Sequence, residues 1–230
     1  MSTADTHELT VTAATHITPL MRRITLTGDS LETFECVPGQ DVVLHLVDDS
    51  GNGVRRRYTV RNLDNVARRF DLDFVMHGHG PGAKWAADVA VGSRLEVFGP
   101  RGKVALSDAG WQLFLGDESA LPGIAEMAAA LPASSGGVAI IEVDDANERQ
   151  PIPGPLDVRW VFRDGAPAGT TTSLDESLSD LPVPRGDRHA FVFGESRVVR
   201  RLRDALQARG FGAPEVTAKG YWNLGRAMRD

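Results

Sequence analysis

Hydrophobic and polar residues alternate along several short segments in the first half of the chain, and this two-residue period is typical of β-strands. In residues 41–47, for example, Val42, Leu44 and Leu46 fall on one face. Turn-forming residues separate the segments, most densely at residues 48–53. Short strands at this spacing predict a small antiparallel β-barrel. The predicted strands are residues 8–16, 20–26, 41–47, 55–61, 70–76 and 94–98.

The pattern changes near Ser107, where short apolar strands begin to alternate with segments of helical spacing. Such alternation predicts an α/β layer with a mostly parallel sheet. We therefore predict two domains, a β-barrel over residues 1–107 and an α/β domain over residues 108–230. The second domain's predicted strands are 112–115, 138–143, 158–162, 190–193 and 215–218, and its predicted helices are 120–131, 172–181 and 198–209.

The composition is that of an ordinary globular protein, with 42% hydrophobic and 24% charged residues in a chain of 230. The formal net charge of −6 disfavours non-specific binding to nucleic acid. No apolar run approaches the roughly 20 residues that a membrane-spanning helix needs. Residues 1–9 lack the basic and apolar regions of a signal peptide. We expect a cytoplasmic protein without an integral membrane segment.

Cys36 is the single cysteine of the chain. It excludes a disulfide within the chain and a cluster held by four of the chain's own cysteines. Any electron chemistry must therefore use a bound organic cofactor or an outside partner. A lone cysteine is most often a small buried hydrophobe, and the sequence assigns Cys36 no chemical role.

Residues 55–61 concentrate four arginines, a tyrosine and a threonine in one predicted strand. Strand alternation places Arg56 and Tyr58 on one face and Arg57 and Arg61 on the other. A guanidinium can grip a phosphate while a phenol ring lies against a planar ring system. The pattern is consistent with a nucleotide grip, and equally with a solvated edge strand whose basic side chains discourage aggregation.

A glycine-rich loop, residues 77–82, follows the predicted strand 70–76 and leads into a short helix. Exposed backbone N–H groups at a helix start suit a phosphate, whereas glycine and proline also mark ordinary turns. His77 and His79 are spaced to share a metal ion. Neither an acidic nor a thiol partner lies nearby in the sequence, so we assign no metal site.

The first strand of the α/β domain runs into residues 116–122, with the sequence GDESALP. Open α/β sheets bind ligands at the carboxyl ends of their strands. This turn lacks the G-x-G-x-x-G dinucleotide fingerprint, and its acidic residues would repel a pyrophosphate placed directly on it. Ser119 is also a plausible helix cap. Near the C-terminus, Tyr221 and Trp222 either cover a flat cofactor or pack between domains.

Taken in order, these motifs resemble those of the siderophore-interacting proteins, FAD-dependent ferric-siderophore reductases of the ferredoxin-NADP reductase superfamily. The resemblance extends from about Leu9 to Arg226. It implies an FAD-binding β-barrel followed by an NAD(P)H-binding-like α/β domain whose C-terminal segment covers the flavin. The matching motifs are Arg56-x-Tyr58-Thr59, His77-Gly78-x-Gly80-Pro81 with Trp85-Ala86, the turn 116–122, Gly194-Glu195 and Gly220-Tyr221-Trp222.

The resemblance also implies a role for each matching residue. Arg56 would hold the FAD pyrophosphate, Tyr58 would lie against the flavin, and Thr59 would face the ring near N5. The rest of FAD would be enclosed by His77, Gly80, Pro81, Ala83 and Trp85. The flavin would be faced from the second domain by Asp117, Glu118 and Ser119. The site would be closed by Tyr221 and Trp222.

The implied chemistry has two halves. A nicotinamide coenzyme, NADPH or NADH, or else reduced ferredoxin, supplies electrons to the flavin, which passes them singly to ferric iron. The siderophore's hard oxygen ligands hold Fe(II) far less tightly, so reduction would release it. No acid–base side chain is required, and we assign none as catalytic. Because siderophore complexes are often anionic, the candidate substrate-binding residues are basic, namely Lys219, Arg101, Lys103 and Arg226.

An arginine near the carboxyl ends of the parallel strands can accept the 2′-phosphate of NADPH. Arg197, Arg200 and Arg201 follow Gly194-Glu195 at the predicted start of a helix. They form either such a phosphate site or the solvated face of that helix. The sequence does not choose between NADH, NADPH and ferredoxin as the donor.

Three departures from the family pattern bear on this interpretation. His79 stands where an acidic residue is common, Gly82 where alanine is usual, and Asn223-Leu224 where a basic pair often follows the aromatics. The last change removes positive charge near the expected siderophore site and leaves the substrate class open. Two other functions stay consistent with the sequence: a general NAD(P)H:flavin or quinone reductase, and a non-catalytic ferric-siderophore binding module.

Overall fold

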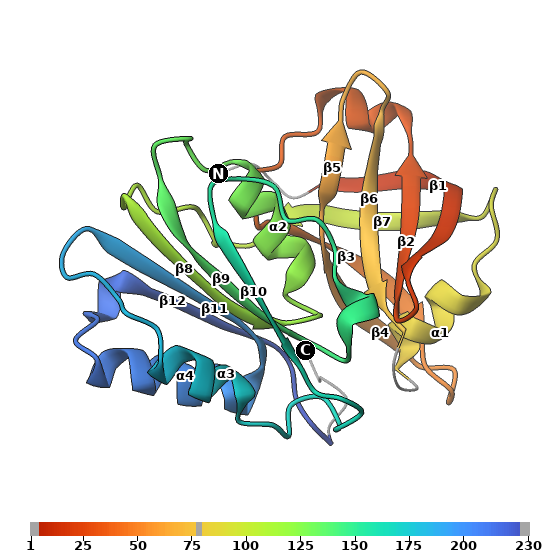
Figure 1. The fold of residues 1–230 in the computed structure, drawn as a ribbon. Helices are drawn as coiled ribbons and strands as arrows, with labels where there is room; N and C mark the ends of the chain where they lie inside the picture. Colours follow the sequence, from red (N-terminus) through yellow and green to blue (C-terminus); the bar gives the residue numbers. More distant parts are fainter. Residues whose placement is uncertain (1–4, 77–79, 226–230) are drawn as a thin grey trace. The chain divides into compact units, whose positions relative to one another are not determined.

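The computed structural model of the chain describes residues 5–76 and 80–225. It divides into two compact domains, one ending at Ala105 and the other beginning at Leu106, each with its own sheet (Figure 1). The predicted site residues His77 and Arg226 lie outside the described residues, as does His79, which was considered only as a metal ligand.

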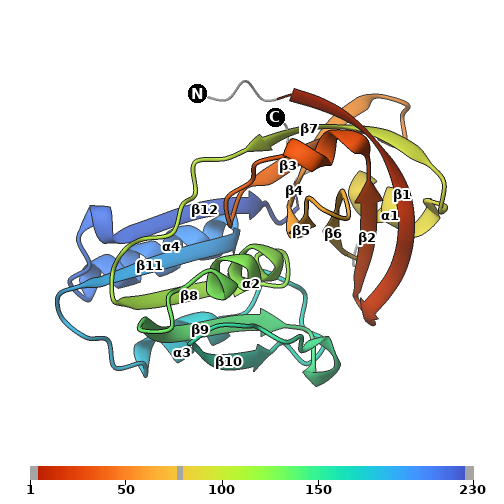
Figure 2. The same ribbon diagram turned by 90° about the horizontal axis from the view of Figure 1, so that it is seen from above.

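The N-terminal domain is built on one seven-stranded sheet in which every neighbouring pair of strands is antiparallel. The strand order is β4-β3-β7-β1-β2-β6-β5, and the sheet curves into a half-barrel (Figure 2). This confirms the predicted antiparallel barrel class. The strands are β1 (Asp5–Thr18), β2 (Met21–Thr27), β3 (Asp41–Val47), β4 (Gly53–Thr59), β5 (Arg61–Asp64), β6 (Arg69–Val75) and β7 (Arg94–Arg101).

The arginine-rich segment forms two strands, so the prediction of a single strand over residues 55–61 is wrong. The chain leaves β4 at Val60, and β4 and β5 form opposite ends of the strand order. A long-range contact explains the break, because the buried Arg61 Nη1 donates to Asp73 Oδ2 of β6 over 3.2 Å. The local alternation of residues carries no sign of that partner.

Hydrophobic side chains from alternate strand positions fill the inside of the half-barrel. Each such side chain contributes roughly 1.5–3 kcal/mol when fully buried. A 3₁₀ turn, η1 (Asp29–Thr33), adds Leu31, and the helix α1 (Pro81–Asp88) adds Ala86. The fully or almost fully buried members include Leu9, Val11, Ile24, Leu26, Val42, Leu44, Phe70, Leu72, Phe74 and Val97.

The C-terminal domain is a parallel five-stranded sheet of order β10-β9-β8-β11-β12. Helix α2 (Leu121–Ala129) covers one face, and α3 (Ser173–Ser179) with α4 (Ser196–Ala208) covers the other (Figures 1 and 2). The predicted α/β class is confirmed. The strands are β8 (Trp111–Asp117), β9 (Gly136–Val143), β10 (Asp157–Phe162), β11 (Arg188–Glu195) and β12 (Val216–Trp222), and the 3₁₀ turns are η2 (Ala146–Glu148) and η3 (Ala213–Glu215).

The order of strands creates a switch point between β8 and β11. From β8 the chain builds β9 and β10 on one side, then crosses to build β11 and β12 on the other. Ligands of open α/β sheets bind at the carboxyl ends of the strands beside such a switch point. Strand β12 continues beyond the predicted residues 215–218 and carries Tyr221 and Trp222 to that same edge.

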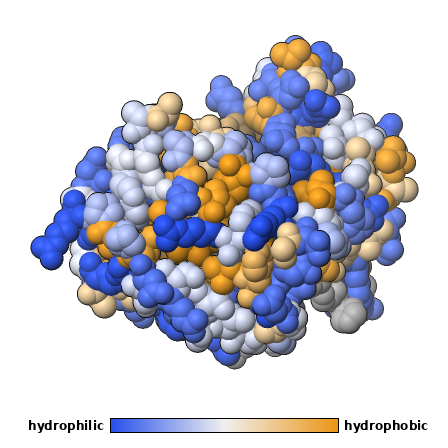
Figure 3. All heavy atoms as spheres, viewed as in Figure 1, coloured by the Kyte–Doolittle hydropathy of each residue, from blue (hydrophilic) through white to orange (hydrophobic). Residues whose placement is uncertain are grey.

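The described helices include none long and apolar enough to cross a membrane. On the face drawn in Figure 3, hydrophilic side chains cover most of the surface, with hydrophobic ones in smaller groups among them.

Candidate functional site

Tyr58 brings strand β4 against the start of helix α1. Its ring packs on Phe74 of β6 with centroids 4.0 Å apart, and Phe74 packs on Trp85 of α1 at 5.2 Å. At Gly82 an added Cβ would lie 1.7 Å from the Tyr58 hydroxyl oxygen, so glycine makes this close approach possible. Burial raises the pKa of Tyr58 above its ordinary value, so it stays a neutral phenol.

Among residues 5–76 and 80–225, no side chain caps the backbone donors at the start of helix α1. Gly80 is the N-cap and makes no side-chain hydrogen bond, Pro81 occupies the first turn, and no acidic residue lies in that turn. The space around Gly80 is open to an added Cβ. A helix start with uncapped N–H groups and a positive dipole end favours an anion. The residues present therefore fit the pyrophosphate of a dinucleotide such as FAD.

The arginines of this segment divide into two kinds. Arg57 pairs with Asp41 of β3 at 2.7 Å, and the buried Arg61 pairs with Asp73. Arg56 lies two residues before Tyr58 on β4, so the two side chains share one face of the strand. Their register partners on the neighbouring strand β3 are the buried Leu44 and Val42. Its Nη1 donates to the Arg55 carbonyl over 2.6 Å. Arg56 is thus the arginine that β4 directs to the side of Tyr58.

The other residues assigned to FAD in this domain lie around the same two elements. Thr59 is the last residue of β4 and pairs with Asp41 across β3. Ala83 and Trp85 are half-buried residues of α1. Lys84, the residue between them, pairs with Asp49 at 2.5 Å.

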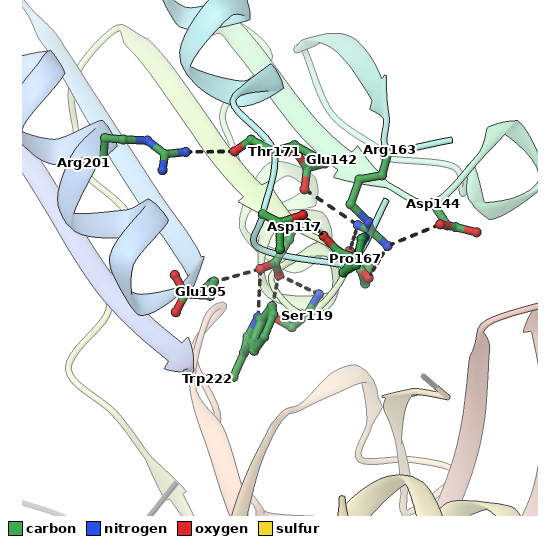
Figure 4. A network of polar contacts seen from close by, with 12 residues as sticks. Asp117, Ser119, Glu142, Asp144, Arg163, Pro167, Thr171, Glu195, Arg201 and Trp222 are labelled. Atoms are coloured by element: carbon green, nitrogen blue, oxygen red, sulfur yellow. Dashed lines mark hydrogen bonds and ion pairs between the residues drawn. The ribbon is translucent and has the colours of Figure 1, made fainter. Parts of the chain in front are cut away.

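In the C-terminal domain, Asp117 turns inward at the end of β8 and is 5% exposed. Its Oδ1 accepts from the backbone N–H of Ser119 over 2.9 Å and from its hydroxyl over 2.5 Å. Its Oδ2 accepts from the Glu195 N–H and from the Trp222 indole N–H, each over 2.9 Å (Figure 4). Burial, and then the charge of Glu118, raise the pKa of Asp117 to about 6.

Glu118 also points into the domain, where a buried arginine neutralises it. Arg163, which follows β10, donates from Nη1 and Nη2 to the two Glu118 oxygens over 2.6 and 2.8 Å. Glu142 of β9 lies 3.8 Å and Asp144 3.9 Å from the same guanidinium. Thr171 donates its hydroxyl to Glu142, whose pKa burial raises. Figure 4 shows this network at the carboxyl edge of the sheet.

Glu195 closes the start of helix α4. Its Oε2 accepts from the N–H groups of Arg197 and Val198 over 2.6 and 2.9 Å. Its Oε1 accepts from the Leu224 N–H over 3.1 Å. A single carboxylate therefore ties the end of β11, the first turn of α4 and the segment after β12 together.

The sequence motifs did not single out Arg163, Glu142 or Thr171. Glu195 was visible only as part of a family motif. The sole sequence signal for Arg163 is a charged residue directly after an apolar strand, at the edge where parallel strands end. Which carboxylate it would meet depends on strand order, which the local pattern does not give.

An aromatic row ends at the C-terminal segment. Phe114 stacks on Phe191 at 5.0 Å, Phe191 contacts Phe193 at 6.0 Å, and Phe193 stacks on Tyr221 at 5.4 Å. The Lys219 ammonium lies 5.2 Å from the Tyr221 ring centroid. Tyr221 is therefore held by ring contacts that cross β8, β11 and β12.

Two further basic candidates belong to the N-terminal domain. The Arg101 guanidinium lies 5.3 Å from the ring centroid of Phe98, and both Arg101 and Lys103 are exposed. Within residues 5–76 and 80–225, no group of three or more His, Cys, Asp or Glu side chains is placed to hold a metal ion.

Two family models match the chain, one in each domain. Residues 44–104 match the siderophore-interacting FAD-binding domain. Residues 109–225 match the siderophore-interacting protein family. The first match contains β4 and α1, and the second contains the Asp117 network.

Known proteins agree with these matches. The ferric vibriobactin reductase ViuB of Vibrio cholerae is 34% identical over 180 residues, covering 75% of this chain and 66% of that protein. The NADPH-dependent ferric-chelate reductase of Escherichia coli is 27% identical over 242 residues, covering 94% and 92%.

A crystal structure of a siderophore utilization protein from T. fusca superposes with a TM-score of 0.91 at 32% identity, covering 100% of this chain and 97% of that one. The fold is ferredoxin-NADP reductase-like, with an FAD-binding half-barrel before a parallel α/β domain. Matches this long, in both domains and in fold, show that the chain belongs to the siderophore-interacting protein family.

Proposed function

We propose that this protein is an FAD-dependent reductase that passes electrons to the ferric iron of a siderophore, so that the iron leaves as Fe(II). The observation that carries the proposal is the uncapped start of α1 beside Tyr58, inside the segment that matches the FAD-binding domain. The names of the Vibrio cholerae and Escherichia coli relatives support the reductase activity.

The N-terminal domain would hold the cofactor. Arg56 and the N–H groups at the start of α1 would bind the FAD pyrophosphate, since both supply positive charge and donors. Tyr58 and Thr59 would line the flavin ring. When bound, FAD supplies the conversion between a two-electron donor and a one-electron acceptor.

The C-terminal domain would close the site with Tyr221 and Trp222. In this proposal Asp117 and Glu118 act from within the domain, because their carboxylates bind Trp222 and Arg163. Electron transfer to ferric iron requires no acid–base side chain, so we propose no catalytic acid or base.

The substrate would be an anionic ferric siderophore with hard oxygen ligands. Lys219 is the candidate best defined by the structure, since it lies over Tyr221. Arg101 and Lys103 are exposed on the other domain, and Arg226 stays a prediction. Positive charge of this kind would steer an anionic complex and add to its on-rate.

For the electron donor we propose NADPH, with NADH and reduced ferredoxin as the alternatives. The Escherichia coli relative is named as NADPH-dependent. Of the three arginines near the start of α4, Arg201 is bound by Asp175 through hydrogen bonds of 2.5 and 2.6 Å. Arg197 and Arg200 are exposed and are the better candidates for a 2′-phosphate.

One anaerobic experiment tests cofactor, donor and acceptor together. The FAD-loaded protein is mixed with NADPH or NADH, bleaching of the flavin is followed, and a ferric hydroxamate or ferric catecholate is then added with an Fe(II) chelator. We expect bleaching, then recovery of the flavin colour with formation of the Fe(II) complex. Recovery with quinones but not with ferric siderophores would instead indicate a general reductase, and absence of bound flavin would indicate a binding module.

A pair of matched variants tests the cofactor grip. Arg56→Ala removes the guanidinium on the Tyr58 face, and we expect FAD affinity to fall about tenfold to hundredfold, the equivalent of 1.5–3 kcal/mol. Arg55→Ala removes an exposed guanidinium from the neighbouring position of β4 and should change affinity less than about twofold. Equal losses in the two variants would contradict the assignment of Arg56.

A further inference from the structure

Trp222 is fixed at the carboxyl edge of the parallel sheet by contacts at both its ends. Its indole N–H donates to Asp117 Oδ2 over 2.9 Å, and its carbonyl accepts from the Ser196 hydroxyl over 2.9 Å. These partners come from the end of β8 and the start of α4. The orientation of the indole therefore depends on a side chain from the far side of the switch point.

The Asp117 carboxylate has its own geometry set by four donors, two on each oxygen. Gly194 makes room for it, because an added Cβ there would lie 2.5 Å from Asp117 Oδ2 and the residue has φ of +128°. With both oxygens engaged the carboxylate cannot rotate, so it presents Oδ2 to the indole in one direction.

We propose that Asp117 is a positioning residue, which fixes the orientation of the Trp222 indole, the ring that would cover the flavin in the proposed function. This inference rests on the proposed function, because it needs a flavin for Trp222 to cover. The residue would act on cofactor binding only through Trp222, since its own carboxylate is buried and fully bonded.

The charge of Asp117 supports this role over a purely structural one. A buried carboxylate beside Glu118 is costly to ionise, and the pKa of Asp117 is raised to about 6. A neutral acceptor would satisfy an indole N–H at lower cost. A carboxylate, however, accepts on both oxygens at once, which the asparagine amide cannot do.

The first test observes Trp222 directly by ¹H–¹⁵N NMR of the full chain, whose four tryptophans give separate indole N–H signals. Trp222→Phe assigns the signal. We expect Asp117→Asn to shift it and to speed its exchange with D₂O by about tenfold or more, the weight of one charge-assisted hydrogen bond. In the matched variant Ser119→Ala, which removes a donor from the other oxygen, the signal should keep its position and exchange rate.

The second test asks whether Asp117 acts through Trp222. We expect Asp117→Asn and Trp222→Phe each to weaken FAD binding about tenfold, and the double variant to bind no more weakly than Trp222→Phe alone. Losses that multiply to about a hundredfold would overturn the positioning role. An indole signal unchanged in Asp117→Asn would overturn it too, whether or not FAD binds.

The wild-type protein offers a third test should Asp117→Asn not fold. As pH falls through about 6, protonation removes one acceptor site from Asp117, and the Trp222 signal alone should move with that midpoint. The charged groups around Asp117 are Glu118 on its own turn, Glu195 on β11, Glu142 on β9, and Arg163 after β10, which pairs with Glu118. A Trp222 signal that stays unchanged while the ¹³C signal of the Asp117 carboxyl titrates would overturn the proposal. Failure of the wild-type protein to bind FAD would overturn the proposed function, while the indole signals would still report on Asp117.

Discussion

The two domains treat the starts of their helices in opposite ways. In the N-terminal domain, α1 begins at Pro81 after the N-cap Gly80; no described side chain caps it, and no acidic residue lies in its first turn. In the C-terminal domain, Glu195 accepts from two N–H groups of α4, and Asp117 accepts from the turn that leads into α2. Within the described residues, one domain leaves these donors without a side-chain cap, and the other uses them within the fold.

This difference teaches where an anionic cofactor belongs. A phosphate at α1 would meet N–H donors and a positive dipole end, whereas a phosphate at α4 would have to displace a carboxylate already bonded there. The switch point, which in open α/β sheets usually receives the ligand, is filled here by the chain's own acids. We therefore expect the affinity for FAD to come chiefly from the N-terminal domain.

The largest effect should come from removing Arg163, the cation of the buried network at the carboxyl edge of the C-terminal sheet. Arg163→Met would leave Glu118 and Glu142 buried without their arginine, and we expect a loss of about 3–5 kcal/mol in the free energy of unfolding of the C-terminal domain. Arg159→Met is the matched control, because Arg159 pairs with Asp157 at an exposed site and should cost less than about 1 kcal/mol. Urea denaturation followed by circular dichroism gives both values, and similar losses would show that the network is not what holds this edge.

A carboxylate placed at α1 should turn the open start into a closed one. Gly80→Asp would cap the helix and repel a pyrophosphate, so we expect FAD affinity to fall at least about tenfold while the unliganded domain gains about a few tenths of a kcal/mol of stability. Flavin fluorescence titration and chemical denaturation measure the two changes. Gly80→Ala, which adds a side chain without charge, should keep most of the affinity; loss in both variants would point to crowding instead.

The reverse change removes the side-chain cap at the start of α4. Glu195→Ala removes the cap of α4 and the acceptor for Leu224, and we expect a loss of about 1–2 kcal/mol in the free energy of unfolding. Glu195→Gln keeps one acceptor oxygen and should lose less. If glutamine cost as much as alanine in thermal and urea unfolding, hydrogen bonding would not be the reason for the glutamate.

The smallest effect should come from the close contact between Gly82, in the first turn of α1, and the Tyr58 hydroxyl. Gly82→Ala places a methyl group where the Tyr58 hydroxyl lies, and we expect a loss of about 1 kcal/mol together with a change in the near-ultraviolet circular dichroism of the aromatics. Tyr58→Phe removes that hydroxyl, so the same alanine should cost less in the Tyr58→Phe background. An equal cost in both backgrounds would rule out a clash with the hydroxyl.

The sequence predicted the fold class because strand and helix periods are local properties. It failed at Val60, where the alternation of residues continues but the strand does not, since Arg61 is drawn to Asp73 of another strand. The last strand was predicted to end at residue 218 but continues to Trp222, and the reason is similar. Residues 219–222 pair with β11, and nothing local in a glycine and two aromatics announces that pairing.

The candidate site was predictable where the contacts are short in sequence and not where they are long. The grouping of Arg56 with Tyr58 followed from strand alternation, and the open helix start from Gly80 and Pro81. The role of Asp117 in facing the flavin stays a prediction, and the sequence did not reveal that its carboxylate binds partners 78 and 105 residues away. Which way an acidic side chain turns depends on donors that only the assembled sheet brings near.

The hydrogen bond between Asp117 and Trp222 also affects when the C-terminal domain can fold during synthesis on the ribosome. The N-terminal half-barrel can complete its sheet as soon as β7 has emerged. Asp117, by contrast, waits through the next 105 residues for its last donor. Until then a buried acid lacks one of its partners, so the nascent α/β domain should stay open to proteases and chaperones until translation has passed Trp222.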